Sequence, residues 1–125
     1  MESTTNLDLS QFIGTSSYYP TFMFTPKLHH TDGVQYFAEN AGCFWFLDIV
    51  ATEIYPLLKR EPFISITLNS FDGKAKIIAT DGDEKEIFTK SIGYTNCPVG
   101  IYKFYLTDNV LMLTSEYWYA HARYP

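Results

Sequence analysis

The sequence is short of positive charge. It has nine lysines and arginines against 14 aspartates and glutamates, which gives a formal net charge of −5. The basic residues are scattered along the chain, whereas surfaces that bind nucleic-acid backbones gather them into a patch or stripe. We therefore expect no nucleic-acid partner. Solubility alone accounts for the acidic excess, although a protein that imitates nucleic acid would also be acidic.

Cysteines and long apolar runs are also scarce. Cys43 and Cys97 are the only two cysteines, so we expect no disulfide framework and interpret both as free thiols in a reducing compartment. The longest apolar run is far shorter than the roughly 20 residues that cross a bilayer. Residues 1–9 carry acids and hydroxyl groups in place of the basic start of a signal peptide. These absences predict a cytoplasmic protein with no membrane partner.

Aromatic residues, by contrast, are abundant. The chain has ten tyrosines and ten phenylalanines, and aromatic side chains make up 18% of its 125 residues. This length predicts a single domain over residues 1–125 with room for a sizeable core. Aromatic side chains fill such cores, and on a surface they mark places where two chains meet.

The longest uninterrupted pattern runs over residues 31–60 and predicts one long helix, from residue 32 to 58. Thr31 and Asp32 offer side-chain oxygens that cap a helix start, and the apolar residues that follow recur with helical spacing. A glycine in mid-helix weakens it, so the alternative is a helix broken near Gly42. Residues 43–51 are apolar on all sides except at Asp48, which predicts that this half is buried.

The second half of the chain predicts an antiparallel sheet of about five strands. Apolar and polar residues alternate there, and Asp-Gly and Asp-Asn pairs supply hairpin turns. The predicted strands are residues 63–69, 74–80, 86–92, 101–107 and 110–114. Residues 7–13 predict a short N-terminal helix that ends at Gly14. The expected fold class is therefore α+β, with the long helix packed on one face of the sheet.

Asp48 is the first candidate for a functional acid. A helical wheel through residues 34–52 places it on the core side, where a carboxyl needs hydrogen-bond partners or stays neutral. It is either a structural acid or a general acid or base in a pocket. Asp48, Glu39 and Asp32 form the candidate catalytic set. No nucleophile elbow or phosphate-binding loop accompanies them, so the sequence leans against an enzyme and predicts no cofactor.

His29, His30 and Asp32 form a weak candidate metal site at the predicted helix start. Three ligands on a loop without an obvious fourth are a poor indication of a metal, so we expect none. The alternatives are an anion held at the helix N-terminus, or one packed and one exposed histidine. A small hydrolase or ligand-binding domain that uses Asp48, Asp32 and His29 or His30 is the competing functional hypothesis.

Aromatic residues gather toward the two ends of the domain. Residues 15–24, with Pro20, suit an edge strand or an extended arm, and residues 115–124 are too aromatic for a loose end. Exposed aromatic patches usually mark contacts between proteins. Our leading hypothesis is a non-enzymatic interaction protein that self-associates or binds another protein. The expected interface residues are Tyr18, Tyr19, Phe22, Tyr117, Trp118 and Tyr119.

The motif around the predicted helix resembles a family of small bacterial, plasmid and phage proteins catalogued as a domain of unknown function. The resemblance rests on Phe12-x-Gly14-Thr15, Tyr18-Tyr19, Thr31-Asp32-Gly33-Val34, Ala38-Glu39, Ala41-Gly42, Trp45, Asp48 and Leu113-x-Ser115-Glu116-Tyr117. It covers most of the chain and implies no activity. It does imply that Asp32, Glu39, Trp45, Asp48 and Glu116 are positions to watch. The occurrence of this family on mobile elements implies an accessory or inhibitory role.

Overall fold

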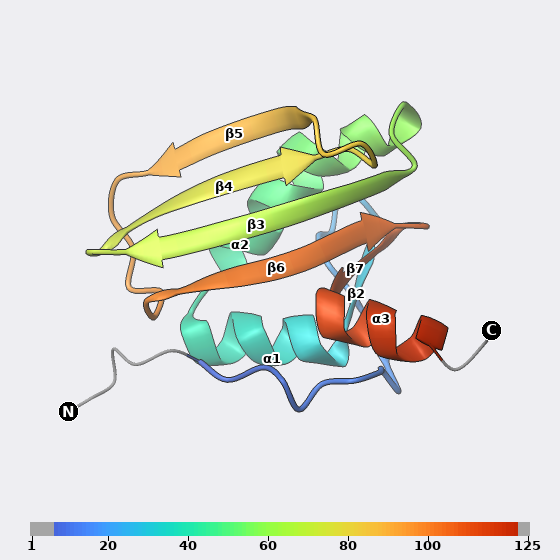
Figure 1. Cartoon of the computed structure of the whole chain (residues 1–125), viewed down its shortest axis with the longest axis horizontal. Helices are drawn as coiled ribbons and strands as arrows, with labels where there is room; N and C mark the ends of the chain where they lie inside the picture. Colours follow the sequence, from blue (N-terminus) through green and yellow to red (C-terminus); the bar gives the residue numbers. More distant parts are fainter. Residues whose placement is uncertain (1–6, 123–125) are drawn as a thin grey trace.

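A mixed sheet of seven strands forms the centre of the protein (Figure 1). The computed structural model describes residues 7–122, and the side chains of residues 7–118. The strands are β1 (Tyr18–Pro20), β2 (His29–Thr31), β3 (Phe63–Phe71), β4 (Lys74–Thr80), β5 (Glu86–Ile92), β6 (Gly100–Thr107) and β7 (Val110–Leu113). Their order across the sheet is β1-β2-β7-β6-β3-β4-β5. The helices are α1 (Asp32–Ala41), α2 (Phe44–Ile49), the π-helix η1 (Val50–Ile54), the 3-10 helix η2 (Tyr55–Lys59) and α3 (Thr114–Ala122).

The sheet is not the predicted five-stranded antiparallel one. Strands β3 to β7 pair antiparallel with their neighbours, but β2 pairs in parallel with β7, with His29 opposite Val110. Strand β1 then adds antiparallel to β2. The prediction was wrong because β1 and β2 have three residues each, too few to reveal an alternating pattern. Thr114, predicted as the end of a strand, begins α3.

The single long helix is also wrong, because the chain breaks at Gly42. Helix α1 ends at Ala41, and Gly42 adopts a left-handed conformation with φ of 67° while its N–H bonds to the Ala38 carbonyl. Glycine takes this conformation without the steric penalty of a side chain, so it ends helices in this way. A second helical segment, residues 44–59, starts in a new direction. Of the predicted N-terminal helix, the described residues form only a turn, in which Phe12 N–H bonds to Leu9 O.

The core lies between the sheet and the two helical segments α1 and α2. In β3, the buried residues Ile64, Ile66 and Leu68 alternate with more exposed ones, as expected for a sheet with one covered face. Phe37 of α1 and Phe46 of α2 meet Phe104 of β6 with ring centroids 5.3 and 4.8 Å away, respectively. These rings join the two helices to the centre of the sheet.

Helix α3 lies against the opposite face of the sheet, at β6 and β7 (Figure 1). Cys43 and Cys97 are buried and unbridged, which confirms the predicted free thiols. The interaction with the neighbouring Cys97 thiol, together with burial, raises the pKa of the Cys43 thiol. No helix within residues 7–122 is long and apolar enough to cross a membrane.

Candidate functional site

One buried carboxylate connects three separate parts of the chain. Glu116 is 4% exposed. Its Oε1 accepts hydrogen bonds from Thr31 Oγ1 at 2.5 Å and from the backbone N–H of Leu113 at 2.9 Å. Its Oε2 accepts a bond from Gly33 N–H at 3.1 Å. We call these four residues the Glu116 clamp, because they fasten the end of β2 and the first turn of α1 to the start of α3.

The clamp is built from two ordinary helix-capping elements. Thr31 caps α1, with its hydroxyl 3.4 Å from the N–H of Val34. Glu116 is the third residue of α3 and reaches back to the N–H just before that helix, as the glutamate of a capping box does. The first N–H groups of a helix have no partner within it. Here one carboxylate satisfies such groups in two helices at once, and both helix dipoles favour its negative charge.

The environment of Glu116 affects its protonation in two opposing ways. Burial raises the pKa of the Glu116 carboxyl, because a charge is less stable away from water. The hydrogen bonds from Thr31, Leu113 and Gly33 lower it in part, and the nearby charge of Asp32 raises it further. The net direction is upward.

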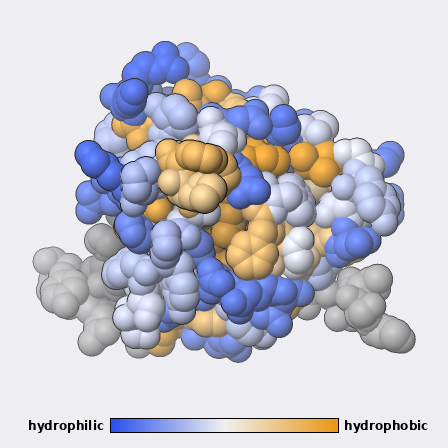
Figure 2. Space-filling view, turned by 180° about the vertical axis from the view of Figure 1, so that it is seen from behind, coloured by the Kyte–Doolittle hydropathy of each residue, from blue (hydrophilic) through white to orange (hydrophobic). Residues whose placement is uncertain are grey.

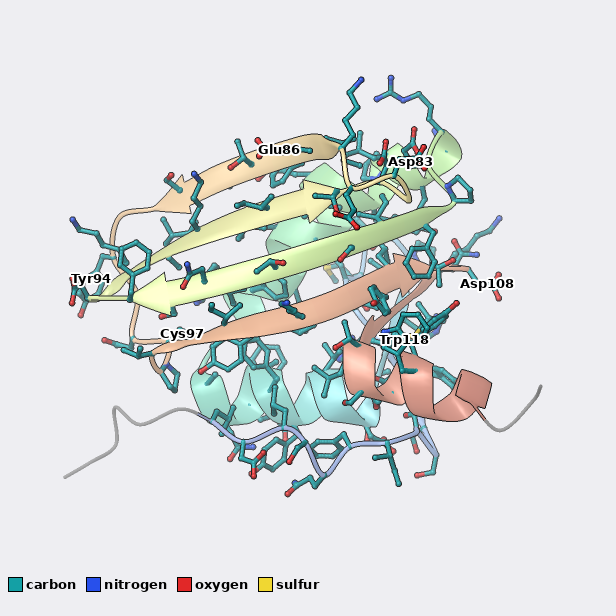
Figure 3. The ribbon with its side chains drawn as sticks, in the orientation of Figure 1. Asp83, Glu86, Tyr94, Cys97, Asp108 and Trp118 are labelled. Carbon is teal, nitrogen blue, oxygen red and sulfur yellow. The ribbon has the colours of Figure 1, made fainter. Side chains whose placement is uncertain are left out.

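A cleft of about 600 Å³ opens beside the clamp. We call it the Glu116 cleft. Its lining comes from the N-terminal segment, the ends of β2 and β3, the β6–β7 turn and α3; Figure 3 labels Asp108 at that turn and Trp118 on α3. The residues that line it are Ile13, Gly14, Thr15, Tyr18, Thr31, Phe63, Thr107, Asp108, Val110, Met112, Glu116 and Tyr117.

A cluster of aromatic rings stands next to the cleft, on the sheet face that α3 covers. Tyr105 lies 4.8 Å from Phe63 and 5.1 Å from Tyr117, measured between ring centroids. Trp118 follows at 5.2 Å from Tyr117 and donates its indole N–H to the hydroxyl of Tyr105 at 2.8 Å. The ring of Trp118 is therefore fixed in place although the residue is 59% exposed.

Asp32 anchors the N-terminal segment and does not face the cleft. Its Oδ2 accepts bonds from the backbone N–H of Ser16 at 2.8 Å and from the Ser16 hydroxyl at 3.0 Å. These bonds, led by the backbone one, lower the pKa of the Asp32 carboxyl. The N–H of Asp32 bonds in turn to Thr15 Oγ1 at 2.9 Å. This carboxylate is thus used to hold the segment that forms one wall of the cleft.

The candidate metal ligands His29, His30 and Asp32 do not converge. His30 is buried between Thr21 Oγ1 at 2.9 Å and Gln35 Oε1 at 2.6 Å, and burial lowers the pKa of its imidazole. His29 Nδ1 lies 3.1 Å from the carbonyl of Lys27. Among the described residues, no three histidine, cysteine or acidic side chains gather in a way that could hold a metal ion.

Asp48 is exposed on α2, so its predicted burial is wrong. The helical wheel assumed one continuous helix, whereas the break at Gly42 resets the direction of the second segment. Glu39 is also exposed and accepts a bond from Gln35 Nε2 at 2.8 Å. Neither residue lines the Glu116 cleft, so the structure does not bring the candidate catalytic set together.

Replacing Asp48 with asparagine is accordingly expected to change the free energy of unfolding by less than about 0.5 kcal/mol, because the side chain is exposed. Thermal or urea unfolding of the variant and the parent protein measures this. Loss of a hydrogen-bonded buried polar group costs about 1–3 kcal/mol. A decrease of about 2 kcal/mol or more in the free energy of unfolding would therefore contradict the exposed position of Asp48.

The expected interface residues differ in exposure. Tyr18 is 60% and Trp118 59% exposed, whereas Tyr19, Phe22 and Tyr117 are only partly exposed. The side chain of Tyr119 lies outside the described residues. Sequence reasoning missed the convergence of Thr31 and Gly33 on Glu116. The cap at Thr31 and the glutamate spacing after Leu113 were visible, but nothing local indicated that the two helix starts meet.

The residues of the clamp and those that line the cleft all lie in the part of the sequence that a protein-family model matches. A family model described as a family of unknown function matches residues 3–117. The chain belongs to this family, DUF6876. The expected resemblance to a domain of unknown function is thereby confirmed. All residues that line the cleft fall inside the DUF6876 match, whereas Trp118 lies one position beyond it. No curated protein and no solved structure matches the chain.

Proposed function

We propose that this DUF6876 protein is a cytoplasmic, non-enzymatic interaction module that self-associates through an aromatic surface. That surface comprises Tyr18, Phe63, Tyr105, Tyr117 and Trp118. The observation that carries the proposal is the exposed indole of Trp118, which is held in one orientation by its bond to Tyr105. Tryptophan and tyrosine are enriched among the residues that contribute most to protein interfaces.

The energetics of association support this surface. Burying a large aromatic side chain contributes about 1.5–3 kcal/mol. The usual entropic cost of immobilising an interface side chain is small here, because ring contacts and a hydrogen bond already fix Trp118. On the opposite face of the molecule, apolar residues are interspersed with hydrophilic ones (Figure 2). The aromatic surface is therefore the better candidate for a contact.

The arrangement of the acids also favours binding over catalysis. The carboxylates of Asp32 and Glu116 are occupied by bonds that hold the fold together. A catalytic base takes a proton from its substrate, and the bonds that Asp32 and Glu116 already accept make these carboxylates weaker bases. The proposal includes a narrower role, that of an accessory or inhibitory protein of mobile-element origin. Such a protein would bind its target through the same aromatic surface.

Sedimentation velocity tests the proposal directly. We expect the parent protein to form dimers or larger species, and Trp118→Ser to weaken association about tenfold or more, as loss of a central interface residue does. Tyr94→Ser is the matched control, because Tyr94 is also a highly exposed aromatic residue, at 78%, and lies in the β5–β6 connection. A parent protein that stays monomeric at all concentrations, or an equal effect of both variants, would refute the proposal.

A further inference from the structure

We infer that the Glu116 cleft is a binding site for an organic cation that carries N–H donors, such as a guanidinium or primary ammonium group. This site goes beyond self-association. It shares Tyr18, Phe63 and Tyr117 with the proposed association surface, but Trp118, on which that proposal depends, is not among the residues that line the cleft.

The cleft has the size and construction of a ligand site. Its volume of about 600 Å³ lies within the range of about 300–1,000 Å³ that is usual for small-molecule sites. Asp32 holds the N-terminal wall through Ser16, and the Glu116 clamp holds α3 against β2. The walls are therefore fixed before a ligand arrives, which lowers the entropic cost of binding.

The charge of the lining selects the sign of the ligand. Asp108 and Glu116 contribute two carboxyl groups, and none of the described residues that line the cleft is a lysine, arginine or histidine. The chain as a whole is acidic as well. A cleft lined by one sign of charge concentrates ligands of the opposite sign. An anionic ligand would be repelled by both carboxylates.

Glu116 offers a specific acceptor in the cleft. A carboxylate has about four lone-pair positions, and the described residues donate two bonds to Oε1 and one to Oε2. Among the described residues Oε2 thus accepts one bond fewer than Oε1, on a side chain that is 4% exposed and lines the cleft. An N–H donor from a cation would complete the set and compensate a buried negative charge.

The aromatic part of the lining suits the same ligand. Tyr18, Phe63 and Tyr117 each contribute to the cleft. The faces of such rings attract cations, and the attraction grows where water is excluded. Neutral apolar ligands would contact the same rings but bring no positive charge to the carboxyl groups of Asp108 and Glu116. The cleft therefore fits a flat or compact organic cation better than an uncharged molecule of the same shape.

Butylguanidinium and butylurea test this inference as a matched pair of probes, because they share a shape and differ in charge. Titrations followed by amide chemical shifts are expected to show saturable binding of butylguanidinium, with the largest shifts near Gly33, Asp108 and Tyr117. Butylurea is expected to bind at least about tenfold more weakly. Equal affinity for the two probes, or the absence of saturable binding by butylguanidinium, would overturn the inference.

Two aspartates in equivalent turns provide the control variants. Asp108 and Asp72 both occupy left-handed turn positions, with φ of 53° and 51°, a conformation that asparagine accepts readily. Asp72 lies outside the cleft lining. We expect Asp108→Asn to weaken butylguanidinium binding about threefold, as expected for one exposed charge, and Asp72→Asn to leave it unchanged. Equal effects of the two variants would show that overall charge, and not the cleft, attracts the probe.

The same experiments separate this site from self-association. Trp118→Ser is expected to bind butylguanidinium at least as tightly as the parent protein, because Trp118 does not line the cleft and loss of association would leave its shared rings uncovered. Asp108→Asn is expected to keep the oligomeric state of the parent protein. A monomeric parent protein that binds the probe would refute only the proposed self-association. A dimer that binds butylurea and butylguanidinium equally would refute only the cation site.

Discussion

Replacing Glu116 with alanine is expected to reduce the free energy of unfolding by about 3–5 kcal/mol. The change leaves the Thr31 hydroxyl and the N–H groups of Gly33 and Leu113 without their acceptor, and Thr31 is itself buried. Each unsatisfied buried donor costs about 1–3 kcal/mol, less any relief from water that enters the site. Urea unfolding monitored by tryptophan fluorescence and circular dichroism measures the loss.

Glutamine at position 116 provides a graded comparison. It keeps one carbonyl oxygen for Thr31 and Leu113 but turns an NH₂ group toward the N–H of Gly33, so we expect a smaller loss, of about 1–3 kcal/mol. Glu86→Ala, at an exposed position of β5, is the control and is expected to change stability by less than about 0.5 kcal/mol. Similar stability of Glu116→Ala and Glu86→Ala would contradict a structural role for the clamp.

The difference in stability between the parent protein and Glu116→Gln is expected to depend on pH. Burial raises the pKa of Glu116 in the folded protein above its unfolded value of about 4.3. The folded state therefore binds a proton at Glu116 more readily than the unfolded state does. The free energy of folding gained from this protonation is fully present below the pKa of the unfolded state, and it is lost as the pH rises through the pKa of the folded state. The stability difference between the parent protein and Glu116→Gln should accordingly be larger at pH 4 than at pH 7. A difference that grows toward neutral pH would contradict the raised pKa.

Replacing Gly33 with alanine is expected to cost about 2–3 kcal/mol, because the site has no room for a methyl group. A Cβ atom at this position would lie 2.5 Å from Leu113 Cδ1 and 3.0 Å from the Cδ and Oε2 atoms of Glu116. Leu113 and Glu116 are both buried, so neither can move away freely. The result would reverse the usual preference, since alanine is favoured over glycine inside a helix by about 1 kcal/mol. Denaturant unfolding checks the sign.

Gly82→Ala is the matched control for this substitution. Gly82 lies in the turn between β4 and β5, where no heavy atom comes within 4 Å of the added Cβ, and its φ is not in the left-handed region. Alanine there should leave stability unchanged or raise it by up to about 1 kcal/mol. If Gly33→Ala were as stable as Gly82→Ala, α3 would not pack against the first turn of α1 as described.

The parts of the fold that the sequence predicted are those with a local signal. Residues 74–80 and 86–92 coincide with β4 and β5, because their alternation and turn residues are contained within each segment. The cap at Thr31 was predicted for the same reason. The three-residue strands β1 and β2 have no comparable signal, and the parallel contact of β2 with β7 depends on residues about 80 positions away.

The candidate site illustrates the same limit. Asp48 was placed in the core by extending one helical period through Gly42, and a single left-handed residue was enough to invalidate the extension. Glu116 attracted notice only through a resemblance, because its three donors come from different elements. Asp108 was correctly predicted to lie in a turn. Its position on the cleft follows only from the packing of α3 beside that turn.

The bonds from Glu116 to Thr31 and Gly33 join positions 85 and 83 residues apart. During synthesis, which proceeds at about 5–20 residues per second, the hairpins β3–β4 and β4–β5 can form while the beginning of α1 still lacks its acceptor. Residue 116 must leave the ribosome before Thr31 and Gly33 can donate their hydrogen bonds to Glu116. The earlier two-thirds of the chain therefore spends several seconds as a nascent species with exposed strand edges, the period in which a chaperone would encounter it.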